Sequence, residues 1–298
     1  MASSIQAGQF AQLPHGIKLH YASAGDKTKP LILFLHGFPE FWFAWEAQLK
    51  EFGQDYFAVA PDLRGFNLSD MPADAASYKP RFIAQDIQSF IEHLGYKQCV
   101  LVAHDWGGAV AWNMAIAQPE LFSKLIILNS PHPYLFAQAL VHDQAQKEAS
   151  EYMNWLRATG SEQALAKDDF SLMEKLFVGM SDPHPAWFND TLRKEYHACW
   201  SKGLTGGVNY YRASPMHPAT KDNPGAAKLV LNPEDLHCKL PVRVIWGERD
   251  RALLPVLIDG LEKFIADLQI ERWSDASHWL VHEHPDRVNQ TIRRFLAE

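Results

Sequence analysis

Cysteine is scarce in this chain of 298 residues, and acidic residues outnumber basic ones. The three cysteines stand far apart, which excludes a disulfide framework and a zinc-finger pattern; they are Cys99, Cys199 and Cys238. The formal net charge of −7, with no basic stripe, argues against a nucleic-acid partner. His282 and His284 flank Glu283 without the helical spacing of metal ligands, so we predict neither a metal site nor a cofactor.

The sequence also has no apolar run that approaches the length of a membrane span. Residues 1–8, MASSIQAG, lack the basic and apolar regions of a secretory signal. We therefore expect a cytoplasmic protein without a membrane span, whose partners are a small molecule and water. Monomer and homodimer both stay open.

Short apolar runs alternate with segments of helical periodicity along most of the chain. The runs predict strands at 16–21, 31–35, 57–60, 99–103, 125–128, 242–247 and 270–273. The helical spacing predicts helices at 81–94, 258–268 and 285–296. This alternation is typical of the α/β class, with a mostly parallel, doubly wound sheet covered by helices on both faces.

The alternation stops near Asn129 and resumes at 242–247. Between these points the sequence shows helical periodicities, at 145–157, 169–177 and 187–200, but no convincing buried strand. We predict that residues 131–232 form an inserted helical cap. Residues 1–130 and 233–298 then form the two parts of an α/β-hydrolase core.

The segment 99–111, CVLVAHDWGGAVA, joins a buried strand to a helix through a polar corner at Asp105. Small residues after the corner let helix and strand pack closely, so the corner side chain points outward above the sheet. This pattern is typical of a nucleophile elbow, in which the corner residue is usually serine.

An aspartate at the elbow selects a different chemistry from a serine. A carboxylate that attacks a saturated carbon forms an ester, which activated water can cleave, whereas a serine would form an ether that resists hydrolysis. Asp105 therefore indicates displacement at an sp³ carbon, as in an epoxide or a carbon–halogen bond. The alternative is an elbow that has lost its catalytic serine and only binds a ligand.

Three further loops at the carboxyl edge of the sheet carry the other candidates. The backbone N–H groups of Phe38 and Trp106 form a predicted oxyanion hole. His278 follows the last strand and would deprotonate water, with Asp250 as its acidic partner. The competing carboxylates for the partner role are Asp275 and Glu248. The turn at 62–70 is interpreted as structural, with Asp62 and Arg64 holding the loop near the elbow.

Seven motifs, in this order along nearly the whole chain, resemble those of the α/β-hydrolase-fold epoxide hydrolases. They are HGFPEFWFAW (36–45), DLRGFNLSD (62–70), AHDWGG (103–108), SPHP (130–133), NYYRAS (209–214), GERD (247–250) and DASHW (275–279). The resemblance implies that an apolar epoxide is opened to a vicinal diol through a covalent ester. It implies that Asp105 is the nucleophile, His278 the base and Asp250 its partner.

The resemblance also assigns roles to tyrosines of the cap. Tyr211 matches the second tyrosine of the family's stretch and would donate to the epoxide oxygen. Tyr152 is the expected second donor, and Tyr134 is the alternative to it. The residues expected to line the substrate pocket are His36, Pro39, Trp106, Tyr134, Tyr210 and Trp279.

Dehalogenases are the nearest alternative. Fluoroacetate dehalogenases resemble the chain but carry arginines after the nucleophile, where this sequence has Trp106 and Ala109. Haloalkane dehalogenases share the tryptophan, yet usually have Asn or Glu at the position of Phe38 and do not use paired tyrosines. A catalytically silent ligand-binding protein is the third interpretation.

Overall fold

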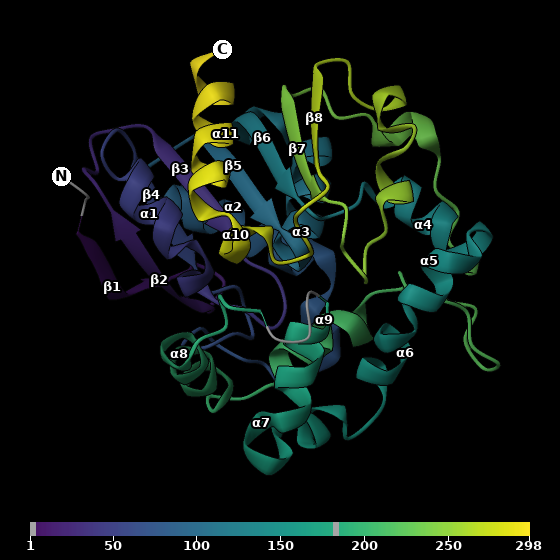
Figure 1. Ribbon diagram of the computed structural model, residues 1–298. Helices are drawn as coiled ribbons and strands as arrows, with labels where there is room; N and C mark the ends of the chain where they lie inside the picture. Colours follow the sequence, from purple (N-terminus) through teal and green to yellow (C-terminus); the bar gives the residue numbers. More distant parts are fainter. Residues whose placement is uncertain (1–3, 181–184) are drawn as a thin grey trace.

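A computed structural model describes residues 4–180 and 185–298 and contains an eight-stranded sheet (Figure 1). The strand order is β1-β2-β4-β3-β5-β6-β7-β8, with β1 and β2 antiparallel to their neighbours and the remaining pairs parallel. The strands are β1 (Ile5–Gln12), β2 (Lys18–Ala24), β3 (Leu31–Leu35), β4 (Phe57–Pro61), β5 (Cys99–His104), β6 (Phe122–Leu128), β7 (Val242–Gly247) and β8 (Leu268–Trp273). The predicted α/β class, with a mostly parallel sheet covered by helices, is confirmed.

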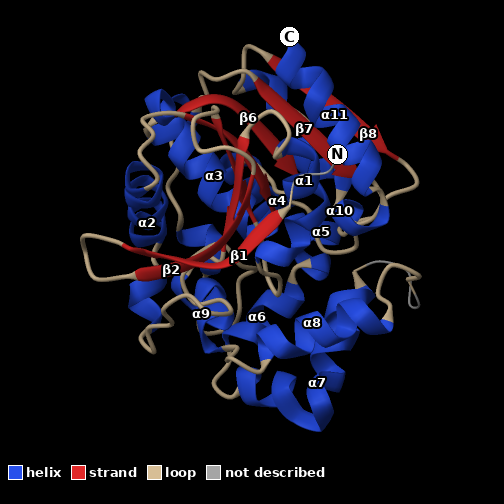
Figure 2. Ribbon diagram, turned by 90° about the vertical axis from the view of Figure 1, so that its left-hand side faces the viewer, coloured by secondary structure: helices blue, strands red, loops and turns tan. Residues whose placement is uncertain are grey.

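Alternate side chains of the central strands enter two separate cores, because successive residues of a strand face opposite sides of the sheet. On one side α2 (Pro80–His93) and α3 (Asp105–Ala117) pack against residues such as Leu33 and Leu101. On the other side α1 (Glu46–Phe52), α10 (Leu280–Glu283) and α11 (Pro285–Ala297) cover residues such as Phe34 and Val102. Figure 2 shows the sheet between these helices.

The described residues between β6 and β7 form helices and turns, without a strand. The α-helices are α4 (Pro133–His142), α5 (Gln144–Ala149), α6 (Glu151–Arg157), α7 (Ser161–Gly179), α8 (Asp190–Trp200) and α9 (Thr205–Ala213). Figure 1 shows α6, α7, α8 and α9 gathered beyond one end of the sheet strands. The division of the chain into core and cap at 131–232 stays a prediction.

Two sequence-based helix predictions differ from the structure. The helix predicted at 258–268 is wrong: two 3-10 turns, Pro255–Ile258 and Leu261–Lys263, stand there, separated by Gly260 with a φ of +86°. A left-handed residue ends a right-handed helix. The segment 145–157 is divided at Ser150 into α5 and α6. The buried Ser150 hydroxyl accepts a hydrogen bond from Gln146 at 2.8 Å at that break.

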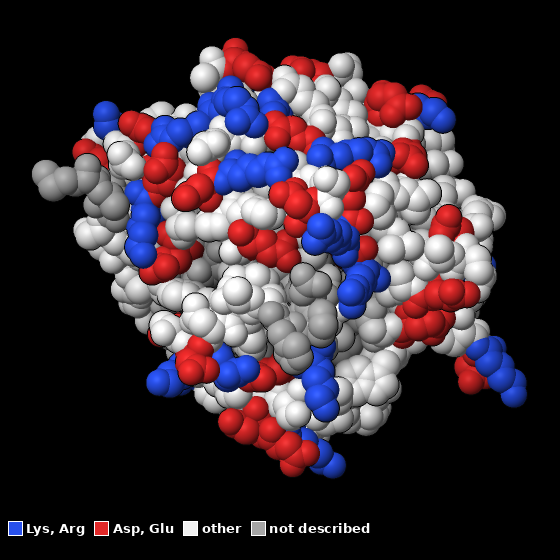
Figure 3. Space-filling model, in the orientation of Figure 1, with Lys and Arg blue, Asp and Glu red and all other residues white. Residues whose placement is uncertain are grey.

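The surface carries acidic and basic side chains interspersed with one another on the face seen in Figure 3. Within residues 4–180 and 185–298, no helix combines the length and apolar character needed to cross a bilayer. The same part of the chain contains no group of three or more His, Cys, Asp or Glu side chains placed to hold a metal ion.

Candidate active site

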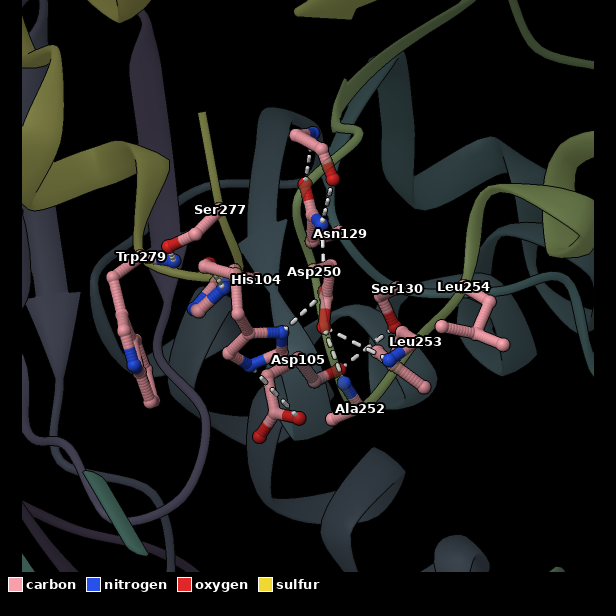
Figure 4. A network of polar contacts seen from close by, with 12 residues as sticks. His104, Asp105, Asn129, Ser130, Asp250, Ala252, Leu253, Leu254, Ser277 and Trp279 are labelled. Carbon is pink, nitrogen blue, oxygen red and sulfur yellow. Dashed lines mark hydrogen bonds and ion pairs between the residues drawn. The ribbon is translucent and has the colours of Figure 1, made fainter. Parts of the chain in front are cut away.

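Asp105 lies at the sharp turn between β5 and α3, as the elbow pattern predicts (Figure 4). Its φ of +49° is left-handed, a conformation that non-glycine residues adopt rarely. Gly107 permits the close packing behind it, since a Cβ there would lie 2.4 Å from the carbonyl oxygen of Leu35. The Ser130 hydroxyl donates to the Asp105 carbonyl at 2.7 Å and holds the turn from β6. The local sequence therefore directs the carboxylate away from the sheet.

The Phe38 backbone N–H donates to Asp105 Oδ1 at 2.8 Å, so the predicted oxyanion-hole donor reaches the carboxylate. The loop approaches closely because Gly37 has no side chain: a Cβ there would lie 2.2 Å from Oδ1. Trp106 occupies the first turn of α3, where backbone N–H groups lack helical partners. The arrangement can bind negative charge on an oxygen of Asp105.

His278 stands between the two aspartates. Its Nδ1 lies 2.6 Å from Asp250 Oδ2, and its Nε2 lies 3.7 Å from Asp105 Oδ2. The side chains of His278 and Asp250 are buried, and Nε2 has no hydrogen-bond partner among the described residues. An unpaired, buried ring nitrogen beside the carboxylate is placed to accept a proton from a water molecule.

Asp250 is held by three donors besides His278. The backbone N–H groups of Ala252 and Leu253 donate to its Oδ1 at 2.8 and 2.9 Å, and Asn129 Nδ2 donates to its Oδ2 at 2.7 Å. Asn129 also accepts from the N–H of Gly247, which fixes its amide. Sequence reasoning missed Asn129; its position at the end of β6, next to the elbow strand, was the available signal.

The two competing carboxylates do not reach His278. Asp275 is exposed and pairs with Arg287 at 2.9 Å, and Glu248 lies 3.5 Å from Arg272. Asp250 is therefore the carboxylate that the fold brings to the histidine.

The charge environment favours the protonated form of His278. Burial alone would lower its pKa, but the negative charge and hydrogen bond of Asp250, together with the charge of Asp105, raise that pKa to about 9. A raised pKa means that this histidine contributes stability below its ordinary value of 6.5 and that this contribution is lost as the pH rises through 9. Removing the charge on Asp105 removes one of the causes of the raised pKa.

A second buried hydrogen-bond network, centred on Glu40, reaches the backbone of His278, and the sequence did not predict it. Glu40 accepts a hydrogen bond from Tyr196 at 2.9 Å and lies 2.6 Å from His282 Nε2 and 3.1 Å from His104 Nδ1. The other ring nitrogen of His104 lies 2.8 Å from the carbonyl oxygen of His278. Burial alone would raise the pKa of Glu40, but hydrogen bonds from His104 and His282 lower it below its ordinary value. The HGFPE motif gave the residue, but not its partners.

Glu40→Gln is expected to destabilise the fold by about 1–3 kcal/mol, because it leaves buried partners of the carboxylate without an anion. Since the folded-state pKa of Glu40 is lowered, its contribution is present above the ordinary value of 4.5 and is lost as the pH falls. Thermal unfolding of both proteins from pH 2.5 to pH 7 measures this. An equal difference in unfolding free energy at every pH would contradict the assignment of an ionised Glu40.

An apolar cavity of about 260 Å³ lies over Asp105. One face of α3 forms its floor, because Asp105, Ala109 and Asn113 are spaced by four residues. Its other lining residues are mostly carbon-rich: Tyr78, Pro80, Ile83, Trp106, Val110, Ser130, Pro131, Pro133, Phe136, Tyr152, Met153, Tyr210, Tyr211, Ser214, Pro215, Met216, Leu229, Leu231 and Leu253. The lining contains no lysine, arginine or histidine among the described residues, so a neutral, apolar ligand fits it.

Tyr152 and Tyr211 meet in this cavity, with ring centroids 6.1 Å apart and an interplanar angle of 75°. The Trp106 ring packs edge-on against Tyr211, with ring centroids 5.0 Å apart. Burial, with the charge of Asp105, raises the pKa of both tyrosines well above the ordinary value of 10. Both hydroxyls are therefore protonated at neutral pH.

The structure brings two of the six predicted pocket residues, Trp106 and Tyr210, to the cavity lining. The other four lie outside it. His36 is buried, and its Nε2 accepts from the Leu63 N–H at 3.0 Å. The remaining three pack elsewhere: the Pro39 carbonyl accepts from Trp200, Tyr134 packs on Phe264, and the Trp279 indole donates to the Phe177 carbonyl. Tyr134 therefore does not stand where the alternative proton donor would need to be.

The turn at 62–70 has the contacts of a structural element. Asp62 accepts from the Trp42 N–H and the Asn67 amide, each at 2.8 Å. Arg64 pairs with the buried Asp86 at 2.6 Å. None of these side chains lines the cavity.

Comparison with known proteins agrees with this geometry. The model of the alpha/beta hydrolase fold family matches residues 30–285. Epoxide hydrolase 4 of Mus musculus is 34% identical over 290 residues, which cover 95% of this chain and 77% of the mouse protein. Epoxide hydrolase 3 of Xenopus tropicalis is 35% identical over 300 residues, covering 98% of this chain and 78% of its own.

The structural comparison extends over the same length. The crystal structure of a Bacillus megaterium epoxide hydrolase with a bound inhibitor superimposes with a TM-score of 0.89, at 35% identity, over 97% of this chain and all of the other. Sequence, strand order and three-dimensional similarity thus agree over nearly the whole length. The chain belongs to the epoxide hydrolase family of the α/β-hydrolase fold.

Proposed function

We propose that this enzyme opens an apolar epoxide to a vicinal diol in two steps through an ester on Asp105. In the first step the Asp105 carboxylate attacks an epoxide carbon, and the bond between that carbon and the ring oxygen breaks. The oxygen takes a proton from the tyrosine pair Tyr211 and Tyr152, which leaves a tyrosinate. An alkoxide is too basic to depart unassisted, so this proton is what the pair supplies.

In the second step water cleaves the ester. His278 Nε2 takes one proton, and the hydroxide adds to the carbonyl carbon of Asp105. The N–H groups of Phe38 and Trp106 stabilise the resulting oxyanion. Collapse releases the diol, whose oxygen takes the proton from His278, and the remaining proton of the water restores the tyrosine. Water and epoxide are consumed, and the enzyme returns unchanged.

The observation that carries the proposal is the pairing of an elbow aspartate with two tyrosine hydroxyls in one apolar cavity. The electrostatics support the order of the steps. Ester formation neutralises Asp105, whose charge is one cause of the raised pKa of His278. Ester formation therefore lets the imidazolium release its proton to solvent, so that the neutral ring acts as the base, and the ring regains a proton once the Asp105 carboxylate is free again. Residues 131–232, as a cap, would carry the tyrosines, and we keep a cytoplasmic location as part of the proposal.

The dehalogenase alternative has less support. A halide needs an N–H donor, and the Trp106 indole that could supply one packs against the rings of Tyr210 and Tyr211. A halide also departs without a proton, which would leave two buried tyrosines with no function in the reaction.

Tyr211→Phe is expected to lower kcat/KM for epoxides by about 10²-fold, because one of the two proton donors is lost. The measurement is diol formation from styrene-type, aliphatic and trans-disubstituted epoxides, beside halide release from a haloalkane and a haloacetate. Tyr96→Phe is the matched control, since the Tyr96 hydroxyl bonds only to surface carbonyls of Lys27 and Lys29 among the described residues. Halide release that exceeds epoxide opening and survives Tyr211→Phe would favour the dehalogenase instead.

A further inference from the structure

The helices that carry the two tyrosines pack against each other, and each is held at its C-terminal end by an arginine of the other. Tyr152 lies in α6 and Tyr211 in α9, and the two helices lie side by side (Figures 1 and 2). The C-terminal carbonyls of a helix lack backbone donors and carry partial negative charge. Two such ends close together repel each other unless positive groups stand between them.

The last turn of α9 lacks one backbone N–H donor. A further helical turn would pair the Tyr211 carbonyl with the N–H of residue 215, four positions later, but that residue is Pro215 and has no N–H. Arg157, the last residue of α6, supplies the missing donor: its Nη1 donates to the Tyr211 carbonyl and, at 2.6 Å, to the carbonyl of Ser214.

Arg212, the residue after Tyr211, makes the return contact. Its guanidinium donates to the carbonyl of Arg157, the last residue of α6, at 3.4 Å, and to that of Ala158, the next residue, at 2.9 Å. It also pairs with Glu162 at 2.5 Å. The two arginines differ in their partners, because Arg157 bonds to two carbonyls and to no carboxylate within the described residues.

We propose that Arg157 is a positioning residue that sets the place of the Tyr211 hydroxyl relative to Tyr152 and Asp105. It acts on the backbone of Tyr211 itself, from the helix that carries Tyr152, so it fixes the separation of the two donors. The inference rests on the proposed function of the tyrosine pair. Arg157 does not line the cavity, so it acts on the reaction only through the groups that it holds.

The kinetic test separates the two chemical steps. Ester formation is measured by intact-protein mass in a His278→Gln background, and overall turnover is measured in the otherwise native enzyme. Arg157→Met keeps the length of the side chain but removes the donors, and it is expected to slow ester formation on the order of tenfold to a hundredfold. Arg157→Lys keeps the positive charge and a hydrogen-bond donor, so it is expected to recover part of the lost rate of ester formation.

Non-additivity distinguishes positioning from general support of the fold. In a Tyr211→Phe background, Arg157→Met is expected to change ester formation by only about twofold, because the group that it positions is already gone. Arg193→Met, which removes a half-buried arginine of α8 that pairs with Glu174, is the control and is expected to leave ester formation unchanged. The same loss in both backgrounds would overturn the inference.

A spectroscopic measurement tests the inference without any turnover. Protein labelled with 3-fluorotyrosine gives a ¹⁹F signal for Tyr211, assigned by its loss in Tyr211→Phe. Arg157→Met is expected to shift or broaden that signal while the signal of the distant Tyr96 stays in place. An unchanged Tyr211 signal would refute the positioning role. An enzyme that forms no ester but shows the shifted signal would instead refute the proposed reaction alone.

Discussion

Asp105→Ala is expected to lower epoxide turnover by about 10⁴-fold or more, because the nucleophile of the first step is removed. His278 and Asp250 remain in place in this variant, but they have no ester on which to act. The measurement is kcat with the best epoxide of the panel, together with intact-protein mass after rapid quenching. The native enzyme should carry a substrate adduct, and Asp105→Ala should carry none.

The control for this variant is its stability. Asp105 has a left-handed backbone, which costs about 1 kcal/mol for a residue with a Cβ and little for glycine. Asp105→Gly therefore loses the carboxylate without that strain, and it should unfold at a higher temperature than Asp105→Ala. Activity that is retained in both folded variants would show that another group attacks the substrate.

His278→Gln is expected to stop the reaction after the first step and to accumulate protein esterified at Asp105. Glutamine matches much of the volume of the ring but cannot accept a proton from water, so the second step loses its base. The expected result is a stoichiometric burst of epoxide consumption, about one per enzyme, with diol formation slowed by about 10³-fold. Peptide mapping should place the adduct on Asp105.

Isotope labelling of the native enzyme tests whether the reaction passes through the covalent ester at all. If water attacks the ester carbonyl, a single turnover in ¹⁸O-water leaves the label in the Asp105 carboxylate. The label then reaches the diol only in later turnovers. Label that enters the diol directly in the first turnover, with unlabelled Asp105, would contradict a covalent intermediate and would leave His278 as a base for direct hydrolysis.

The candidate site could be predicted from sequence where its signals are local. The strand, corner and small residues around Asp105 all lie within one segment, and Phe38 follows a strand in a short motif. Asp250 and His278 follow from strand ends, because parallel strands bring their carboxyl ends to one edge. The structure places these side chains together.

The network around Glu40 could not be predicted in the same way. The partners of Glu40 come from β5, α8 and α10, and no spacing in the sequence relates these three elements. Four of the six predicted pocket residues lie outside the cavity lining for a similar reason. Their side-chain directions depend on packing: Trp279, for example, follows His278 directly but turns into the core to reach Phe177.

Fold elements were predicted best where the pattern is long or fully buried. The strands at 31–35 and 242–247 have the predicted bounds, since both of their faces are covered. The strand β1 was missed because its side chains are mostly exposed at the edge of the sheet. The false helix at 258–268 has helical apolar spacing, but Gly260 takes a left-handed φ and the segment is built from short turns.

The carbon-rich lining of the cavity has a consequence for the release of the diol product. An epoxide brings one weakly accepting oxygen into that lining, whereas a diol brings two hydroxyls that each seek hydrogen bonds. Most of the lining side chains carry no polar group, so the diol leaves part of its hydration uncompensated. The cavity should therefore retain its product less well than its substrate, which limits product inhibition.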